Sequence, residues 1–343
     1  MSTRKERVHS GVIELKLARS SRPSLRLTAP TIQIHNQRPV VRAQTFPSRL
    51  PKGAILNGRY VVDRYLASGG FADVYAGEDR DTRDQVALKI LKCLGGGVDI
   101  QRNAEERFFQ DARLASRMQH PNVARTLAFS AHMFLTDPQG QSSSFRRPFI
   151  VLELLQGDTL AHTIQAEGAL HPTRVAHLLL GALDGLAVGH RLGVVHKDLK
   201  PDNLFVTHPT QPNEHLKVLD FGTARIVGEN WRSLTQPGGM CFTPRYAAPE
   251  YLKDGSASPA IDVYQMGLVM IEMLTGKPAI DASDLMTCTQ AHWDGINIPP
   301  KLGRSTFGPL LRRALARRPE DRYPDASSFR DALRRRCATI FKK

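Results

Sequence analysis

The stretch VVHKDLKPDN, residues 194–203, places three kinds of reactive side chain on one short segment. Asp198 can accept a proton from an attacking hydroxyl group. Lys200 can neutralise negative charge on a transferring phosphate. Asn203 offers an amide oxygen, which suits a hard cation such as magnesium. The stretch therefore predicts chemistry on a phosphate group.

A second motif, VLDFGTA, places Asp220 at the end of an expected strand, seventeen residues after Asn203. A carboxylate there is well placed to hold the same cation. Either Asp198 or Asp220 alone could be an ordinary capping residue before a turn. Two motifs with this spacing instead favour one shared site.

Lys89 lies in the apolar stretch QVALKILKC, residues 85–93, which we expect to form a strand. A buried ammonium group is costly unless a carboxylate or a phosphate meets it. Asp111, on the helix expected next, is the carboxylate best placed to do so. The alternative is a lysine on an edge strand whose ammonium group reaches water.

The elements expected around these motifs change character along the chain. Strands are expected within residues 58–77, 85–93, 124–134 and 148–155, with a helix over 103–119 and a surface loop over 136–147. After Gly157 helices dominate, and the clearest are residues 172–193 and 261–276. A small strand-rich part is therefore joined to a larger helical part.

Six motifs follow one another along the chain: ASGGFADV, VALK, HKDLKPDN, DFG, AAPE and RPEDRY. This series resembles that of the eukaryotic-type (Hanks-type) serine/threonine protein kinases, including bacterial soluble members, over about Arg59 to Arg336. The resemblance implies an α+β, bilobal protein-kinase fold. Its N-lobe would be a small antiparallel sheet with one main helix, and its larger C-lobe would be mainly helical.

The resemblance also implies a role for each matching residue of the catalytic motifs. Asp198 would be the catalytic base or hydroxyl-orienting group, and Lys200 would contact the γ-phosphate. Lys89, braced by Asp111, would hold the α- and β-phosphates of ATP. The ligands of Mg²⁺ would be Asn203 and Asp220.

The remaining matching residues would bind ATP or support the fold. The hinge that hydrogen-bonds adenine would run from Glu153 to Leu155. Besides Lys89 and Asp220, the other ATP-binding positions would be Ala67, Ser68, Gly69, Gly70, Val74, Ala87 and Phe205, with Leu152 as gatekeeper. Structural support would come from His196, from Asp262 bracing the catalytic loop, and from an ion pair between Glu250 and Arg322.

The activity implied is that of an ATP-dependent serine/threonine protein kinase that also phosphorylates itself. The segment TPRYAAPE, residues 243–250, favours protein substrates, because in the family it shapes the peptide platform. Lys200 together with Thr243 favours Ser and Thr, rather than Tyr, as the residues phosphorylated in the substrate. The alternative is a catalytically weak, nucleotide-binding scaffold.

Two departures from the family pattern affect the expected ATP site. Ala67 and Ala72 replace two glycines of the Gly-rich loop, so we expect a stiffer loop. Asp111 replaces the usual glutamate, which shortens the reach toward Lys89 by about 1.5 Å. The helix must therefore lie closer, or the brace is weaker.

Two further departures affect the expected peptide platform and its regulation. Lys197 replaces an arginine that in many members reads a phosphate on the activation loop. Lysine lacks the bidentate fork, so we expect activity to depend only weakly on phosphorylation at Ser233 or Thr235. Phe242 replaces the glycine usual before the Thr-Pro pair, so the platform should be bulkier.

Positive charge is concentrated at the N-terminus. Of the formal net charge of +14, residues 1–50 contribute +8, with ten Lys and Arg against two Glu. We expect residues 1–56 to be a disordered basic arm, or else a docking segment for a partner. Nucleic-acid binding by the arm rests on charge alone and is not favoured. The kinase domain is expected over residues 57–340, with the lobes meeting near residues 153–154.

The four cysteines are scattered, without metal or disulfide spacing. No apolar run approaches the length that a membrane-spanning helix needs, and no apolar block follows the N-terminal charges. These features predict a cytoplasmic protein without a membrane span.

Overall fold

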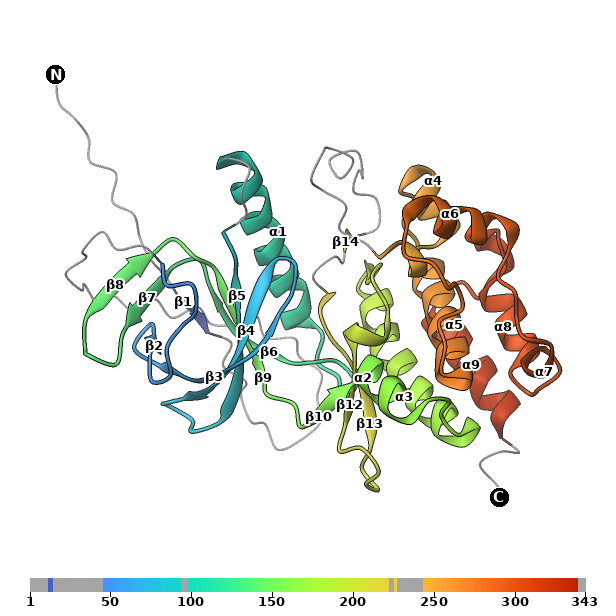
Figure 1. The fold of residues 1–343 in the computed structure, drawn as a ribbon, viewed down its shortest axis with the longest axis horizontal. Helices are drawn as coiled ribbons and strands as arrows, with labels where there is room; N and C mark the ends of the chain where they lie inside the picture. The colour runs from blue at the N-terminus through green and yellow to red at the C-terminus, as the bar shows by residue number, and fades with distance from the viewer. Residues whose placement is uncertain (1–11, 15–45, 94–97, 222–224, 227–242, 339–343) are drawn as a thin grey trace. The chain divides into compact units, whose positions relative to one another are not determined.

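The computed structural model describes residues 12–14, 46–93, 98–221, 225–226 and 243–338 (Figure 1). The chain divides into two compact units. The first takes its described residues from Met1–Arg117 and Arg125–Leu154, and the second takes them from Met118–Ala124 and Leu155–Lys343. As expected, the first unit is built on a sheet with one long helix, and the second is mainly helical.

The described strands of the first unit form one antiparallel sheet in the order β1-β6-β9-β5-β4-β3-β2-β7-β8. Their bounds are β1 Val12–Glu14, β2 Ile55–Leu56, β3 Tyr60–Ser68, β4 Ala72–Asp79, β5 Gln85–Leu91, β6 Thr126–Ser130, β7 Met133–Thr136, β8 Ser142–Phe145 and β9 Phe149–Glu153. Strands β6 and β7 lie toward opposite ends of this order, yet only Ala131 and His132 separate them in sequence. The sheet must therefore curl round on itself.

The central strands β4, β5 and β9 present two different faces, because side chains alternate along a strand. One face contributes to the main core of the unit, whose members include Tyr60, Tyr75, Val86, Leu88, Ile90, Phe149 and Val151. On the other face packs helix α1, Val98–Arg117. Its contacts with the sheet join Phe108 and Ala112 to Leu91, Phe129 and Ile150.

The described part of the second unit consists of helices and two small sheets. The helices are α2 Leu160–Glu167, α3 Pro172–Arg191, α4 Pro249–Asp254, α5 Pro259–Thr275, α6 Leu285–Asp294, α7 Pro300–Gly303, α8 Gly308–Ala314 and α9 Ala326–Cys337, with 3-10 turns η1 Pro201–Asn203, η4 Pro244–Tyr246 and η5 Pro319–Asp321. The sheets are β10 Gly157–Thr159, β12 Leu204–Thr207 and β13 His215–Val218, and the pair β11 Val194–Val195 and β14 Arg225–Ile226.

The two helices predicted most clearly, α3 and α5, are confirmed. Helix α5 is apolar nearly all round and is therefore buried over most of its length. Pro259 begins it, and Gly276 ends it in the left-handed conformation that glycine adopts without strain.

The folded region begins earlier than residue 57, so the prediction of a disordered arm over residues 1–56 is wrong for part of that range. Leu50 and Ala54 are buried in the core of the first unit, and Phe46 packs against it. Strand β1 pairs with β6. These apolar residues are too sparse to form a periodic pattern, and only tertiary contacts bury them. The rest of the arm lies outside the described residues.

The region predicted as one strand and a surface loop, residues 124–147, contains three strands. Strands β6 and β7 are separate because the chain turns at Ala131 and His132, where Asn57 donates to the His132 carbonyl and accepts from the Phe134 N–H group. The expected loop contains β8. Asp137 closes the β7–β8 turn by accepting the N–H group of Gln141 at 2.8 Å.

None of the helices formed by the described residues is long and apolar enough to cross a membrane.

Candidate active site

The catalytic loop of the second unit brings an acid and a cation to one hydroxyl group. Lys200 Nζ lies 3.2 Å from Asp198 Oδ2. It also donates to Thr243 Oγ1 at 2.7 Å, and Thr243 Oγ1 is 3.4 Å from Asp198 Oδ1. The carboxylate and the ammonium group are both largely shielded from solvent. This arrangement can hold a hydroxyl group between a base and a cation.

Asn203 and Asp220 provide oxygen donors of the kind that magnesium prefers. The Asn203 amide group donates to Asp198 Oδ2 at 3.0 Å and to the Asp198 carbonyl at 2.7 Å, which leaves its own oxygen as an acceptor. The Asn203 carbonyl accepts the N–H group of Leu219, the residue before Asp220, at 2.9 Å. This bond brings the two motifs together, and their donor set fits Mg²⁺.

Asp262, at the start of α5, fixes the backbone of the catalytic loop. Its Oδ2 accepts from the His196 N–H group and from His190 Nε2, both at 2.8 Å, and its Oδ1 accepts from the Lys197 N–H group at 2.9 Å. Complete burial by itself raises the pKa of Asp262, but these hydrogen bonds outweigh it and hold the pKa below its ordinary value. The carboxylate therefore stays charged.

His196 connects the catalytic loop to the strand that ends at Asp220. Its Nδ1 accepts from the Asp198 N–H group at 3.3 Å, so the ring proton lies on Nε2, which donates to the Leu219 carbonyl at 2.8 Å. Its ring also contacts Phe221, with centroids 4.8 Å apart. His196 is fully buried and acts as structural support.

Lys197 and Asp220 both have backbone conformations that are unusual for residues with side chains. Their φ angles are 70° and 47°. Such strain persists where surrounding contacts determine the backbone, and it is common at functional sites. For Lys197 those contacts are the Asp262 carboxylate and Gln265, whose amide group donates to the Lys197 carbonyl at 2.7 Å.

In the first unit, Lys89 occupies the interior of the sheet. Strand β5 is paired with β4 on one side and with β9 on the other, which excludes the alternative of an edge-strand lysine. Val74 lies directly opposite Lys89, and Ala87 lies opposite Leu152. All four side chains therefore share one face of the sheet, the face on which α1 packs.

The Gly-rich loop joins β3 to β4 through a tight turn. The Gly69 N–H group donates to the Ala72 carbonyl at 2.9 Å. A Cβ atom at Gly70 would meet nothing within 4 Å, so the backbone there is open to a phosphate. Lys92 donates to the Gly69 carbonyl at 2.6 Å and also contacts Ser68 Oγ. These contacts of Lys92 were not predicted from the sequence, and they add to the stiffness expected of the Gly-rich loop.

The start of the predicted hinge is held by β6. The Glu153 N–H group donates to the Arg125 carbonyl at 3.0 Å, and Glu153 Oε1 accepts the Arg125 N–H group at 2.8 Å. The carbonyl of Glu153, rather than its N–H group, is therefore the candidate partner for adenine. Leu155 and the half-buried Phe205, on β12, belong to the second unit.

Comparison with known proteins agrees with this geometry. The family model of the protein kinase domain matches residues 60–331. The chain belongs to the protein kinase family. The bilobal fold predicted for it is confirmed.

Several bacterial serine/threonine kinases are similar to this kinase domain. PknL of Mycobacterium bovis is 32% identical over 80% of this chain and 65% of its own length. The probable kinase PknB of Bifidobacterium longum is 29% identical, over 81% of this chain and 39% of its own length. The corresponding protein of Corynebacterium glutamicum is 28% identical, over 80% of this chain and 42% of its own length. The chain thus spans between 39% and 65% of the length of these relatives.

The kinase domain contains the predicted ion pair between Glu250 and Arg322. The two groups form a bidentate contact at 2.7 and 2.8 Å. The guanidinium group also donates to the carbonyls of Ala316, Arg317 and Ala260, so all five of its N–H donors are used. Because Arg322 is completely buried, this pair determines how the peptide platform is joined to the C-terminal helices.

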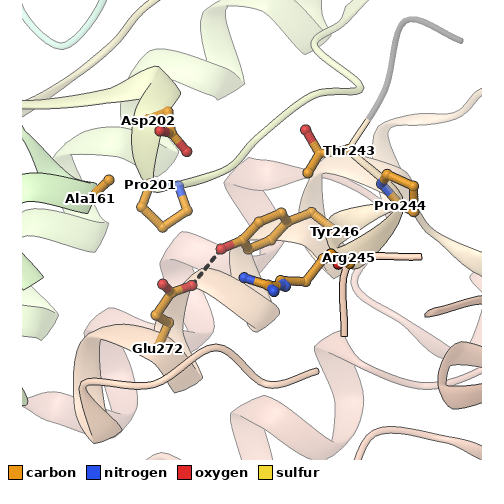
Figure 2. Close-up of a pocket in the computed structure, with 9 residues that line it drawn as sticks. Ala161, Pro201, Asp202, Thr243, Pro244, Arg245, Tyr246 and Glu272 are labelled. Atoms are coloured by element: carbon orange, nitrogen blue, oxygen red, sulfur yellow. Dashed lines mark hydrogen bonds between the residues drawn. The ribbon is translucent and has the colours of Figure 1, made fainter. Parts of the chain in front are cut away.

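A cavity of about 340 Å³ lies beside the catalytic loop (Figure 2). Figure 2 shows Asp202 of the loop, Tyr246 and Arg245 of the platform and Glu272 of α5 around it. The Tyr246 hydroxyl donates to Glu272 at 2.6 Å, and burial raises the pKa of Glu272. Thr243 also lines the cavity, whose volume is large enough for one amino-acid side chain.

His292, on α6, hydrogen-bonds to Pro244 of the segment 243–250 and was not predicted from the sequence. Its Nδ1 accepts from the Tyr264 hydroxyl at 2.9 Å, so its protonated Nε2 donates to the Pro244 carbonyl at 3.0 Å. Burial lowers its pKa from 6.5 to about 4, and the ring is therefore neutral. A lone histidine so far along the chain from its partner leaves no local signal in the sequence.

Some predicted features of the kinase domain fall outside the described residues. Asp111 lies on α1, but the placement of its side chain is not described, so its pairing with Lys89 stays a prediction. The same holds for Phe242 and for the phosphorylation sites Ser233 and Thr235.

Proposed function

We propose that this chain is a protein kinase that phosphorylates Ser and Thr hydroxyl groups of proteins, with ATP as phosphate donor and Mg²⁺ as metal. The observation that carries the proposal is the position of the Thr243 hydroxyl. It lies between the Lys200 ammonium group and the Asp198 carboxylate, at 2.7 and 3.4 Å. A substrate hydroxyl that takes this position meets the base and the cation together.

Asp198 accepts a hydrogen bond from the substrate hydroxyl and orients its oxygen toward the γ-phosphorus. A new bond forms between that oxygen and phosphorus while the bond to the β-phosphate oxygen breaks, and the hydroxyl proton passes to Asp198. Lys200 balances the charge on the transferring group. Asn203 and Asp220 would hold Mg²⁺, which would neutralise charge on the phosphates.

The first unit supplies the contacts to the rest of the nucleotide. Lys89 pairs with the α- and β-phosphates, and the turn at Gly69 and Gly70, whose backbone is open at Gly70, covers them. Val74 and Ala87 share the face of Lys89 and provide an apolar surface for adenine. Protein partners of the basic arm and a cytoplasmic location stay predictions from the sequence.

The test combines phosphate transfer with nucleotide binding. The protein is incubated with labelled ATP, magnesium and a basic protein substrate, and transfer to Ser and Thr is measured. Asp198→Asn should lower turnover by on the order of 10²–10⁴, with nucleotide affinity changed less than about threefold. Lys89→Ala should abolish autophosphorylation, and Asp254→Asn, at an exposed carboxylate on α4, serves as control.

Two outcomes contradict the proposal. Turnover of Asp198→Asn equal to that of the wild type would rule out the assigned base. Nucleotide-induced thermal stabilisation of the wild type without any phosphate transfer would instead identify the chain as a nucleotide-binding scaffold.

A further inference from the structure

The excess of positive charge in the folded part of the chain is confined to its C-terminal helices. Residues 300–338 contain eleven Lys and Arg against four Asp and Glu, a net charge of +7, whereas residues 51–299 sum to −3. Residues 300–338 form α7, α8, η5 and α9 of the second unit (Figure 1). The kinase function described above requires no such excess at this place.

A cavity of about 430 Å³ opens within this basic region. One side of it is helix α9, whose residues Ser328, Asp331, Ala332 and Arg335 recur at helical spacing and share one face. Arg313 at the end of α8, Tyr323 and Pro324 line the cavity as well. We call these seven residues the α8–α9 pocket.

Arg313 and Arg335, the two guanidinium groups of the α8–α9 pocket, form no short ion pair among the described residues, although Arg335 is near enough to Asp331 to help lower the pKa of that carboxyl group. Arg313 stacks over the Tyr323 ring, 4.5 Å from its centroid. Burial raises the pKa of Tyr323, while Arg313, Arg336 and Arg335 act to lower it, which places three cations near one phenol. Within the part of the chain that the structure describes, no carboxylate lies within 4.0 Å of Arg313 or Arg335.

Asp331, the acidic member of the seven residues that define the α8–α9 pocket, is already engaged. Asp331 is 2.8 Å from Arg330 Nη2, and this contact holds the pKa of Asp331 below its ordinary value. Arg330 in turn bonds to Asp184 at 2.8 Å. The local charge left over is therefore positive and comes from the guanidinium groups of residues that line one cavity.

We propose that the α8–α9 pocket binds a phosphorylated segment of a protein. The guanidinium groups of Arg313 and Arg335, which line the same cavity, can each form charge-assisted hydrogen bonds with phosphate oxygens. A phosphoryl group carries a charge of about −1.5 to −2 at neutral pH, which matches the excess left by Arg313 and Arg335. The Ser328 and Tyr323 hydroxyl groups add two donors, and binding relieves the repulsion among the arginines.

The test measures binding of a fluorescein-labelled acidic peptide with one phosphoserine, and of the same peptide with serine, to the full chain. The phosphopeptide should bind the wild type at least tenfold more tightly than the serine peptide. The double substitution Arg313→Ala/Arg335→Ala should remove this preference and weaken phosphopeptide binding by at least tenfold. Arg335→Ala alone, at an exposed side chain, should weaken binding severalfold without changing the melting temperature.

The control variant Arg304→Ala/Arg312→Ala removes the same charge from neighbouring exposed positions outside the pocket, and it should change the affinity less than twofold. Equal losses in the two double variants would show non-specific charge attraction and overturn the proposal. The proposal would also be overturned if inorganic phosphate competed for the pocket as strongly as the phosphopeptide does. It would equally be overturned if a single-stranded oligonucleotide bound more tightly than the phosphopeptide and lost as much affinity in Arg313→Ala/Arg335→Ala.

Discussion

Replacement of Asp262 by asparagine tests how the catalytic loop is held. The substitution preserves the shape of the side chain but exchanges one acceptor oxygen for an NH₂ group. In the native protein both carboxylate oxygens accept N–H groups: Oδ2 from His190 and His196, and Oδ1 from Lys197. Any orientation of the amide therefore places its NH₂ group against another donor.

The least costly orientation keeps the amide oxygen toward His190 and His196. It loses the charge-assisted bond to the Lys197 N–H group, about 1.5–3 kcal/mol, and leaves that buried donor unsatisfied. The two remaining bonds also become weaker, because the acceptor is no longer charged. Together these effects predict a loss of about 3–5 kcal/mol in the free energy of unfolding.

The loss is measured by urea unfolding at pH 7, followed by tryptophan fluorescence and by circular dichroism. Because the pKa of Asp262 lies below its ordinary value of 3.8, the wild type retains this contribution above about pH 5 and loses it only as the pH falls below 4. The turnover number should fall at least tenfold as well, because the displaced Lys197 N–H group adjoins Asp198.

Asp284→Asn is the matched control. Asp284 is an exposed N-cap of α6 that accepts from the Thr287 N–H group, and asparagine caps helices equally well. Its effect should stay below about 0.5 kcal/mol. If Asp262→Asn unfolds within about 1 kcal/mol of the wild type and keeps its turnover number, these three hydrogen bonds do not hold the loop.

Two further predictions concern the peptide platform. His292→Gln retains a hydrogen-bond donor for the Pro244 carbonyl, whereas His292→Met does not. The KM for the peptide substrate should therefore be on the order of tenfold higher in the methionine variant than in the glutamine variant. The KM for ATP should be equal in the two variants. Equal peptide KM values would reduce His292 to a space-filling role. Because the pKa of His292 is about 4, below its ordinary 6.5, the unfolded chain takes up the proton first. Wild-type stability should therefore fall as the pH drops from 6.5 to 4, less steeply in the glutamine variant. Glu250→Ala should lower the free energy of unfolding in urea by about 3–5 kcal/mol, because it leaves the buried guanidinium group of Arg322 without its carboxylate. The control Glu78→Ala, at an exposed ion pair with Arg83, should lower it by less than about 1 kcal/mol. A loss below about 1 kcal/mol for Glu250→Ala would mean that the carbonyl groups alone satisfy Arg322.

The sequence predicted correctly those helices that carry their own start signal and apolar stripe, or that are apolar on all sides because they are completely buried. Helix α3 has a proline in its first turn and an apolar stripe, and α5 is apolar nearly all round, so both were recognised. The boundary at residue 57 was wrong because Leu50 and Ala54 gain their burial from strands far along the chain. Strand β8 was missed because its sequence, SSSF, has no strand pattern, and pairing with β7 alone determines it.

The sequence by itself determined which chemical groups are available and in what order they occur, because the acid, cation and amide of a phosphate site lie within a few residues of one another. It also indicated the pair of Glu250 and Arg322. Only the tertiary structure decided how those groups are held. The resemblance to the family implied that Asp262 braces the catalytic loop, but the three hydrogen bonds by which it does so, across 65 to 72 residues of sequence, are seen only in the structure. His292, which contacts Pro244 across 48 residues, was not predicted. Contacts of that range depend on how whole helices pack, and helix packing leaves no trace in the spacing of neighbouring residues.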